Sequence, residues 1–459
     1  MYTDLRPSTI LVALALLCVP ELAFAGPEPA FDVEAATQSW LATIGPEARA
    51  RSDSYFEGGY WLHYASTALT VAISLTMMML GWASGVRSWL ERKVKFYFFV
   101  AMGMSIFYLT LSYAVAFPFS WYVNFVREHR FGLATQTFPQ WFGEQLIAFV
   151  LQLVIVPLFV AVLYLIVRAT KSAWWIWGAG VTVVFLIVLA TSFPVFVAPL
   201  FNTYTPMEDG PLKQDILLMA QANGVPADNV YVFDVSRQSN RITANVSGMF
   251  GTTRISLSDT LIARASPEAV RHVMAHEIGH YTLNHQVSDL TMLGVTIAII
   301  FALVHWSFQA IVRGERWGVR SIADPAGMPL AAALFSFFVA LATPIDNNIV
   351  RFHELQADHF GLNVSRAPAG AAEAAVMVSE YRKMHPTPFE EWFFYDHPSG
   401  YTRIRMAMQW QAHEIAAGRM PPGPSGPPPG WQPDFTVLKE QVRQPDKKSV
   451  PANPQTGRE

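Results

Sequence analysis

Residues 266–285 read SPEAVRHVMAHEIGHYTLNH, and this stretch decides what kind of domain the chain can build. Its apolar residues recur at helical spacing, and Ser266 is a suitable N-cap. Within the predicted helix, His276 and His280 are four residues apart, so their imidazoles share one face and can bind the same metal ion. Neutral imidazole suits Zn²⁺ as a ligand. The stretch therefore predicts a helix that supplies two ligands to a zinc site.

Glu277 directly follows the first of these histidines and would lie beside the ion. Its carboxylate could accept a proton from a water molecule activated by zinc and pass it to a leaving amine. A chance H-E-x-x-H in a chain of this composition has a probability of about 1%. The alternative is a surface helix with two unrelated histidines. We therefore interpret Glu277 as the catalytic base of a hydrolase.

A catalytic zinc ion needs a third protein ligand and one open position. The chain has a single cysteine, Cys18, so the ligands must be histidines and carboxylates. Glu354 directly follows the last apolar segment, where a helix could return to the zinc helix, and His353 and His359 are alternatives to it. Asp358 is one turn further on and could support a zinc-bound histidine, with a solvated helix charge as the alternative.

The composition is that of a membrane protein. Hydrophobic residues make up 52% of the 459 residues and charged residues 15%, against roughly 25% charged in soluble proteins. Six segments approach the roughly 20 apolar residues that a membrane helix needs: 61–84, 97–120, 146–167, 173–197, 290–312 and 329–346. The net charge of −3, with no Lys/Arg-rich run, gives no reason to expect nucleic acid as a partner.

Apolar and water-facing regions alternate along the chain. Residues 1–25 resemble a secretory signal peptide, with an uncleaved first transmembrane helix as the alternative. Charged and turn residues return after 198, where 212–222 is predicted as an amphipathic helix and 230–233 and 254–257 as strands. The fold class is mainly α, a polytopic membrane helix bundle with an inserted zincin-like α+β metalloprotease domain. After 1–25, the expected parts are an N-terminal membrane domain (26–197), a first metalloprotease part (198–289), two transmembrane helices (290–346), a second metalloprotease part (347–418) and a Pro-rich disordered tail (419–459).

Basic residues gather in three of the loops between apolar segments. They are Arg87, Arg92, Lys93 and Lys95 in the first loop, Arg168 and Lys171 in the second, and Arg313, Arg316 and Arg320 in the third. If the six segments alternate, all three loops lie on one side, which the positive-inside rule makes the cytoplasm. The metalloprotease parts would then face a periplasm-like space, as in a multi-pass protein of a bacterial inner membrane.

Several stretches resemble the CAAX prenyl protease family of integral-membrane zinc metallopeptidases. HEIGH followed by the later ELQAD is similar to the zinc signature of that family. The other matching stretches are RFGLATQTF at 130–138, APLFN at 198–202, Thr205-Pro206, RISLSDTL at 254–261, which resembles the edge strand of the family, and His397-Pro398. The similarity covers about 60 to 410 of the chain.

The resemblance implies that Glu354 is the third zinc ligand and that the membrane helices enclose a large chamber. His397 matches a substrate-contacting histidine, which could hydrogen-bond the oxyanion or the substrate backbone. Members of the family hold the substrate backbone with an Asn-Ala pair. The Asn of that pair aligns with Thr243 here, and Asn245 is a possible substitute for it. Arg403 could help to position His397.

The leading hypothesis is an endopeptidase with one Zn²⁺ per chain that cuts peptides or membrane-protein segments within or beside the lipid bilayer. Eukaryotic members of the family are expected to face the cytosol, which conflicts with the loop charges. We favour the charges, so a misfolded or exported membrane protein is the expected substrate. The alternative is a membrane chaperone or quality-control scaffold that binds chains without cutting, which would not need Glu277. The sequence indicates no oligomeric state.

Overall fold

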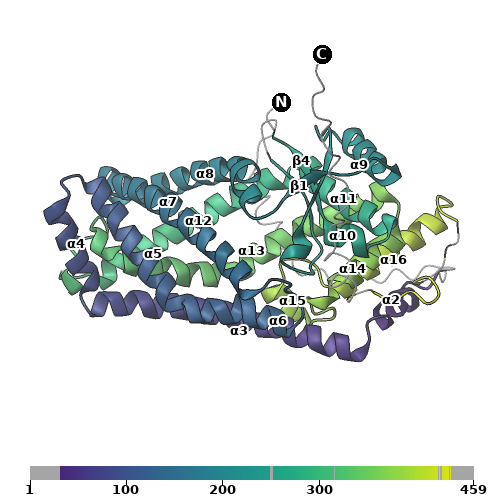
Figure 1. Cartoon of the computed structure of the whole chain (residues 1–459), viewed down its shortest axis with the longest axis horizontal. Helices are drawn as coiled ribbons and strands as arrows, with labels where there is room; N and C mark the ends of the chain where they lie inside the picture. The colour runs from purple at the N-terminus through teal and green to yellow at the C-terminus, as the bar shows by residue number, and fades with distance from the viewer. Residues whose placement is uncertain are drawn as a thin grey trace, which may run out of the picture.

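The computed structural model describes residues 31–248, 252–314, 316–421, 423, 426–433 and 435, so the predicted signal segment lies outside the described residues. Long helices make up one end of an elongated molecule, and a small sheet with shorter helices makes up the other (Figure 1). The long helices are α3 (Pro46–Met79), α5 (Tyr97–Trp121), α7 (Phe138–Thr170), α8 (Trp174–Ser192), α12 (His285–Ile311) and α13 (Met328–Ser365). This confirms the predicted membrane bundle with an inserted domain.

Five stretches of the described chain are long and apolar enough to cross a membrane, and the third, Phe138–Leu200, contains both α7 and α8. These two helices pack against each other after a short 3-10 turn at Lys171–Ala173 (Figure 1). Apolar side chains on them stay exposed, as a lipid-facing surface requires: Val150, Val154, Leu158, Val184 and Val188. The structure therefore supports a multi-pass membrane protein.

The helix bounds differ from the predicted segments. Helix α3 begins and ends earlier than the segment 61–84, because Gly81, with a φ of 70°, turns the chain between α3 and α4 (Trp82–Lys93). Helix α13 continues far beyond the expected end at 346, so the expected boundary between the two transmembrane helices (290–346) and the second metalloprotease part (347–418) falls inside one helix. Pro344 does not end it, because packed membrane helices tolerate the lost backbone hydrogen bond.

The length of α13 connects the membrane to the water-facing domain. At a rise of about 1.5 Å per residue, Glu354 lies about 39 Å along the helix from Met328, whereas the hydrocarbon core of a bilayer is about 30 Å thick. The second half of α13 therefore leaves the hydrocarbon and carries its polar residues into the water-facing domain.

A four-stranded sheet forms the scaffold of that domain. Its strands are β1 (Tyr204–Pro206), β2 (Val230–Phe233), β3 (Ala244–Ser247) and β4 (Arg254–Ser258), in the spatial order β1-β2-β4-β3. The two predicted strands are confirmed as β2 and β4, which pair in parallel. The edge-strand assignment at 254–261 is wrong, because β4 pairs on both sides and β3 is the edge.

Helix α11 (Pro267–Thr282) lies against the sheet. Val270, Met274 and Ile278 recur at four-residue spacing and pack into one buried cluster with Leu257 of β4 and Ile216 of α9. This leaves the opposite face of α11, with the two histidines, free to meet α13. The remaining helices are α2 (Val33–Ala42), α6 (Arg127–Arg130), α9 (Pro211–Ala222), α10 (Asp259–Arg264), α14 (Pro368–Met377), α15 (Pro388–Phe394) and α16 (Gly400–Ala416).

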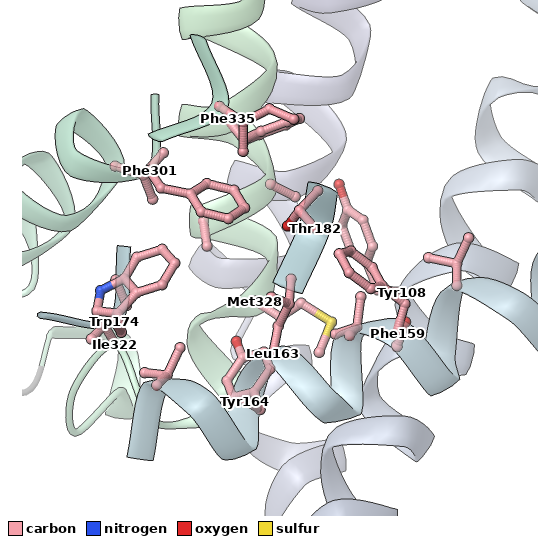
Figure 2. A pocket seen from close by; sticks show the side chains of 18 of the residues that line it. Tyr108, Phe159, Leu163, Tyr164, Trp174, Thr182, Phe301, Ile322, Met328 and Phe335 are labelled. Atoms are coloured by element: carbon pink, nitrogen blue, oxygen red, sulfur yellow. The ribbon is translucent and has the colours of Figure 1, made fainter. Parts of the chain in front are cut away.

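The membrane bundle encloses an apolar cavity of about 370 Å³ between α5, α7, α8, α12 and α13. Figure 2 shows Trp174, Phe301 and Phe335 around it, with Tyr164 and Met328 on the side of α7. The cavity lies in the half of the bundle away from the sheet, because its lining includes the start of α8 and the start of α13.

The three basic loops meet at the end of the bundle that lies farthest from the sheet (Figure 1). Arg320 of the third loop pairs with Glu91 of the first loop at 2.9 Å, and Arg87 lies 3.6 Å from Asp324. Arg168 of the second loop lines the same polar cavity as Arg320. The expectation that the basic loops share one side of the bundle is therefore met.

Part of the C-terminal tail packs on the domain instead of remaining free of it. Trp431 meets Trp40 of α2 edge to face, with the ring centroids 5.1 Å apart, and belongs to the apolar cluster between α2, α14 and α16. Within the expected disordered tail, Trp431 of the described stretch 426–433 therefore contacts the folded domain. An aromatic side chain that finds an apolar partner offsets the cost of ordering the proline-rich backbone.

Candidate metal centre and active-site cavity

The centre is built where α11 crosses α13. Ser266 caps α11 as predicted, since its hydroxyl accepts a hydrogen bond from the Ala269 amide at 3.2 Å. The helices approach closely at two glycines. A Cβ on Gly361 would come within 3.2 Å of the His276 backbone nitrogen, and one on Gly279 would come within 2.9 Å of the Phe360 ring. Close crossing is what brings side chains from both helices to one point.

His276, His280 and Glu354 converge at this crossing. The two Nε2 atoms are 3.1 Å apart, and they lie 3.2 and 3.3 Å from the two carboxylate oxygens of Glu354. Ligand atoms from all three residues lie within 4.8 Å of one another. Among the described residues no hydrogen-bond partner reaches the buried Oε2 of Glu354. Two imidazoles and one unsatisfied carboxylate oxygen form a donor set that fits a catalytic zinc ion with an open fourth position.

The other two candidates for the third ligand lie elsewhere. The His353 ring stacks on His285 at 4.5 Å, and its Nδ1 lies 2.6 Å from Asp289. His359 is exposed, whereas Glu354 is buried. The geometry therefore favours Glu354 over both neighbouring histidines.

Asp358 lies behind His276, on the side away from the cluster. Its Oδ1 is 2.8 Å from Nδ1 of His276, and its side chain is only 2% exposed. Arg403 of α16 contacts the same oxygen. Arg403 therefore supports His276 through Asp358, a role that differs from the expected positioning of His397.

His280 is held by a residue that sequence reasoning missed. Nδ1 of His285, the first residue of α12, lies 3.0 Å from Nδ1 of His280. Nε2 of His285 in turn lies 3.1 Å from the side-chain oxygen of Gln356. His285 is buried, and its ring is held between these two contacts. The only signal in the sequence is a histidine five residues after HEIGH.

His397 faces the cluster from the loop before α16. Its Nε2 lies 3.4 Å from Oε2 of Glu354, and its Nδ1 lies 2.8 Å from Asp396. Arg382 also approaches Nδ1, at 3.4 Å. Contacts with Asp396 and Arg382 therefore fix the ring on its Nδ1 side, while Nε2 points to Glu354. Neither Asp396 nor Arg382 was predicted.

A cavity of about 290 Å³ opens beside the cluster. Its lining includes His276, Glu277, Glu354, Thr243, Ala244, Tyr381, Arg382, His397 and Arg403. Burial raises the pKa of the Glu277 carboxyl above its usual range, which makes it a stronger base than an exposed glutamate. Asn245 lies outside this lining, because the cavity ends at the first residue of β3.

The edge of the sheet lies at the mouth of this cavity. Strand β3 pairs with β4 on one side only, and no other described strand pairs with its free side. Ala244, the first residue of this edge strand, lines the cavity together with Thr243, which directly precedes the strand. A free strand edge offers unpaired amide and carbonyl groups to an extended peptide.

A membrane helix bundle joined to a helix that carries H-E-x-x-H against a small sheet is the architecture of an integral-membrane metallopeptidase. Comparison with known families agrees with this class: the model of peptidase family M48 matches residues 206–411, and the model described as CAAX prenyl protease N-terminal, five membrane helices, matches residues 36–203. The chain belongs to the CAAX prenyl protease family and is a membrane metalloendopeptidase.

Individual relatives support this assignment. The chain is 30% identical over 305 residues to the CAAX prenyl protease 1 homolog of Arabidopsis thaliana, covering 65% of this chain and 70% of that protein. It is 26% identical to the uncharacterized metalloprotease YhfN of Bacillus subtilis over a match that covers 79% of this chain and 86% of that protein. The crystal structure of S. mikatae Ste24p superposes on this chain with a TM-score of 0.67 at 23% identity. The superposition covers 82% of this chain and 94% of that chain, which shows that the two share a fold.

Proposed function

We propose that the protein is a zinc-dependent endopeptidase in which His276, His280 and Glu354 hold one Zn²⁺. The observation that carries this proposal is the convergence of the three ligand atoms beside a cavity that also contains Glu277. Zinc, when bound, would act as a Lewis acid toward the substrate carbonyl and the attacking water. The nitrogen and carboxylate donors and the open fourth position are typical of catalytic zinc sites.

Glu277 is the proposed general base. It lies in the same cavity as the ligands, and its raised pKa brings the carboxylate closer to the value at which it can both accept a proton and return it. In this scheme Glu277 takes a proton from the attacking water and delivers it to the leaving amine. His397 then stabilises negative charge on the carbonyl oxygen, because its Nε2 faces the reacting space.

The substrate is proposed to bind as an extended strand along the free edge of β3. Backbone hydrogen bonds to an edge strand give affinity without sequence preference, and side chains at alternate positions enter pockets. The support is that Thr243 and Ala244 both line the cavity beside the proposed metal site. Asn245 is outside the cavity, so its role would be limited to residues of the substrate far from the cleaved bond.

We propose that the catalytic domain faces the periplasmic side of a bacterial inner membrane. The support is the position of the three basic loops at the opposite end of the bundle (Figure 1). The relatives are named CAAX prenyl proteases. With this orientation, misfolded or exported membrane proteins are more accessible substrates than cytosolic prenylated proteins. A reporter domain fused after residue 288 should be active only outside the cytoplasm, and activity inside would overturn the orientation.

Purified full-length protein and its Glu277→Gln variant test the mechanism. Both should contain about one zinc per chain by elemental analysis, and only the wild type should cut a proteomic peptide library. Equal cutting by both would exclude Glu277 as the base. The absence of zinc from both would reject the ligand assignment. Peptide binding without cleavage by either protein would favour the alternative of a non-cleaving chaperone or quality-control scaffold.

A further inference from the structure

A second cavity, of about 560 Å³, adjoins the catalytic cavity. The two cavities share Tyr381 and Arg382 as lining residues. Arg382 lies 3.4 Å from the His397 ring, so the shared wall stands directly beside the proposed reacting space. The second cavity extends from there between α3, α13 and the end of α15. A substrate bound at the catalytic centre can therefore place a nearby side chain in it.

Aromatic rings dominate the lining of the second cavity. They include Phe56, Tyr60, Tyr64, Phe393 and Phe394. Tyr60 and Phe394 stack with their centroids 3.8 Å apart and their planes 10° from parallel. A cavity of this size, with flat apolar walls on two helices, favours a large side chain that can lie against the rings.

The charged groups around the cavity are mainly cationic. The lining contains three guanidinium groups, from Arg127, Arg241 and Arg382, and one carboxylate, from Asp396. Arg127 lies over the Tyr55 ring at 3.9 Å, and Arg241 pairs with Glu128 at 2.8 Å, so both are held in place. Glu128 and Asp396 offset two of the three guanidinium charges, and the remaining positive charge opposes entry of a lysine or arginine side chain.

We propose that the second cavity is a specificity subsite that binds a large uncharged side chain, preferably aromatic, at one fixed position near the cleaved bond. This inference rests on the proposed peptidase function. It deepens that function, because it names the class of peptide that the enzyme selects. Peptides with lysine or arginine at the same position should be poor substrates.

Gly59 of α3 offers a way to fill the subsite. It lines the cavity, and a Cβ built on it meets no atom within 4 Å, so Gly59→Leu can add a side chain without a backbone clash. Gly143 of α7 is the matched control. It is also helical, a Cβ there also meets no atom within 4 Å, and it lines neither of the two cavities.

The test uses the zinc-loaded, detergent-purified full chain and a peptide library whose products are read by mass spectrometry. The wild type should show one position near the cut that favours Phe, Tyr, Trp, Leu or Met and rejects Lys and Arg. Two matched peptides with Phe or Ala at that position then give the ratio of their kcat/KM values. Gly59→Leu should lower this Phe/Ala ratio at least about tenfold, because closing an apolar pocket removes roughly that discrimination. Gly143→Leu should leave the ratio unchanged.

Phe394→Ala is the second variant, since it widens the same cavity by removing one stacked ring. It should shift the preference from Phe towards Trp. A wild type without any such positional preference would overturn the inference, as would a Phe/Ala ratio that both subsite variants leave at the wild-type value. If cleavage persists in Glu277→Gln, the proposed function itself fails. Glu277-dependent cleavage with an unchanged ratio rejects only the subsite.

Discussion

At the scale of single residues, the two ligand histidines are supported in different ways. His276 faces a carboxylate, Asp358, which Arg403 holds in place. His280 instead faces a second imidazole, His285, which Gln356 orients from the other side. Partners behind a metal-bound histidine fix its ring and raise its basicity, and removing them costs metal affinity. The proposed metal site therefore includes residues that would not themselves bind the ion.

We expect His285→Ala to weaken zinc binding about 10- to 100-fold, the range typical of such partners. The reason is that Nδ1 of His280 loses its neighbour at 3.0 Å. Competition with a chelator of known affinity measures the change. His285→Gln, which keeps a polar acceptor of similar reach, should recover part of the affinity. Wild-type affinity in His285→Ala would show that His280 needs no support.

His272 makes stability depend on pH. It is buried one turn before His276, and burial lowers its pKa to about 3 from 6.5. Below pH 6.5 His272 therefore binds a proton in the unfolded chain, whereas in the folded chain it stays neutral down to about pH 3. Stability is complete above pH 6.5 and falls as the pH drops from 6.5 towards 3, by at most about 1.4 kcal/mol per pH unit from this group.

The corresponding measurement compares wild type with His272→Gln. Thermal unfolding in detergent between pH 7 and 4 should show a steeper loss of stability for the wild type, because the variant lacks this proton. The other histidines titrate in both proteins, so only the difference between the two slopes reports on His272. Identical slopes would contradict the assignment of a neutral buried ring.

At the scale of secondary-structure elements, the site depends on the close crossing of α11 and α13. Gly361 permits this approach, since a Cβ there would lie 3.2 Å from the His276 nitrogen and 3.3 Å from its Cα. Backbone atoms inside a helix cannot move aside as a flexible side chain can. Gly361, which has no side chain to bind metal or substrate, therefore sets the distance between α11 and α13.

Gly361→Ala should destabilise the protein by about 1–3 kcal/mol through overpacking and should lower its zinc content. Thermal unfolding and elemental analysis measure the two effects. Gly143→Ala is the control, because a Cβ there meets open space, and alanine in a helix is favoured over glycine by about 0.5–1 kcal/mol. If both variants behave alike, close crossing is not required.

At the scale of the whole molecule, the C-terminal tail packs against helix α2 at the apolar cluster that α2 shares with α14 and α16. Trp431 packs on Trp40, a residue that is only 1% exposed. Trp431→Ala should lower the unfolding temperature, because a half-buried aromatic pair is worth about 1 kcal/mol beyond the area it buries. Gln432→Ala, at the exposed neighbouring position, should have no effect. An unchanged unfolding temperature in Trp431→Ala would mean that the tail contributes nothing to stability.

The arrangement of the whole molecule also separates its two polar ends. The basic loops and their ion pairs lie at one end of the bundle, and the metal centre lies at the other (Figure 1). Helix α13 spans this separation and carries Glu354 beyond the hydrocarbon. The proposed mechanism would therefore cut peptide bonds at the membrane surface, beside the helix bundle.

Sequence alone was sufficient for the features that depend on the helical repeat and on the length of the apolar runs. The helical repeat places His276 and His280 on one face with Glu277 beside them, whatever the rest of the chain does. The apolar runs predict the membrane helices, because the bilayer requires about 20 such residues for each crossing. The family resemblance added Glu354 and His397, and the comparisons confirm the family.

Tertiary structure alone decided what depends on contacts between distant segments. Packing of α13 on α11 brings Glu354, and not His353 or His359, to the cluster. Packing of α16 on α13 places Arg403 behind Asp358, and Gln356 of α13 contacts His285 behind His280. Strand pairing, rather than similarity, makes β3 the edge. Hydrogen bonding within one helix turn depends only on a short stretch of sequence, whereas side-chain packing between helices depends on the whole chain.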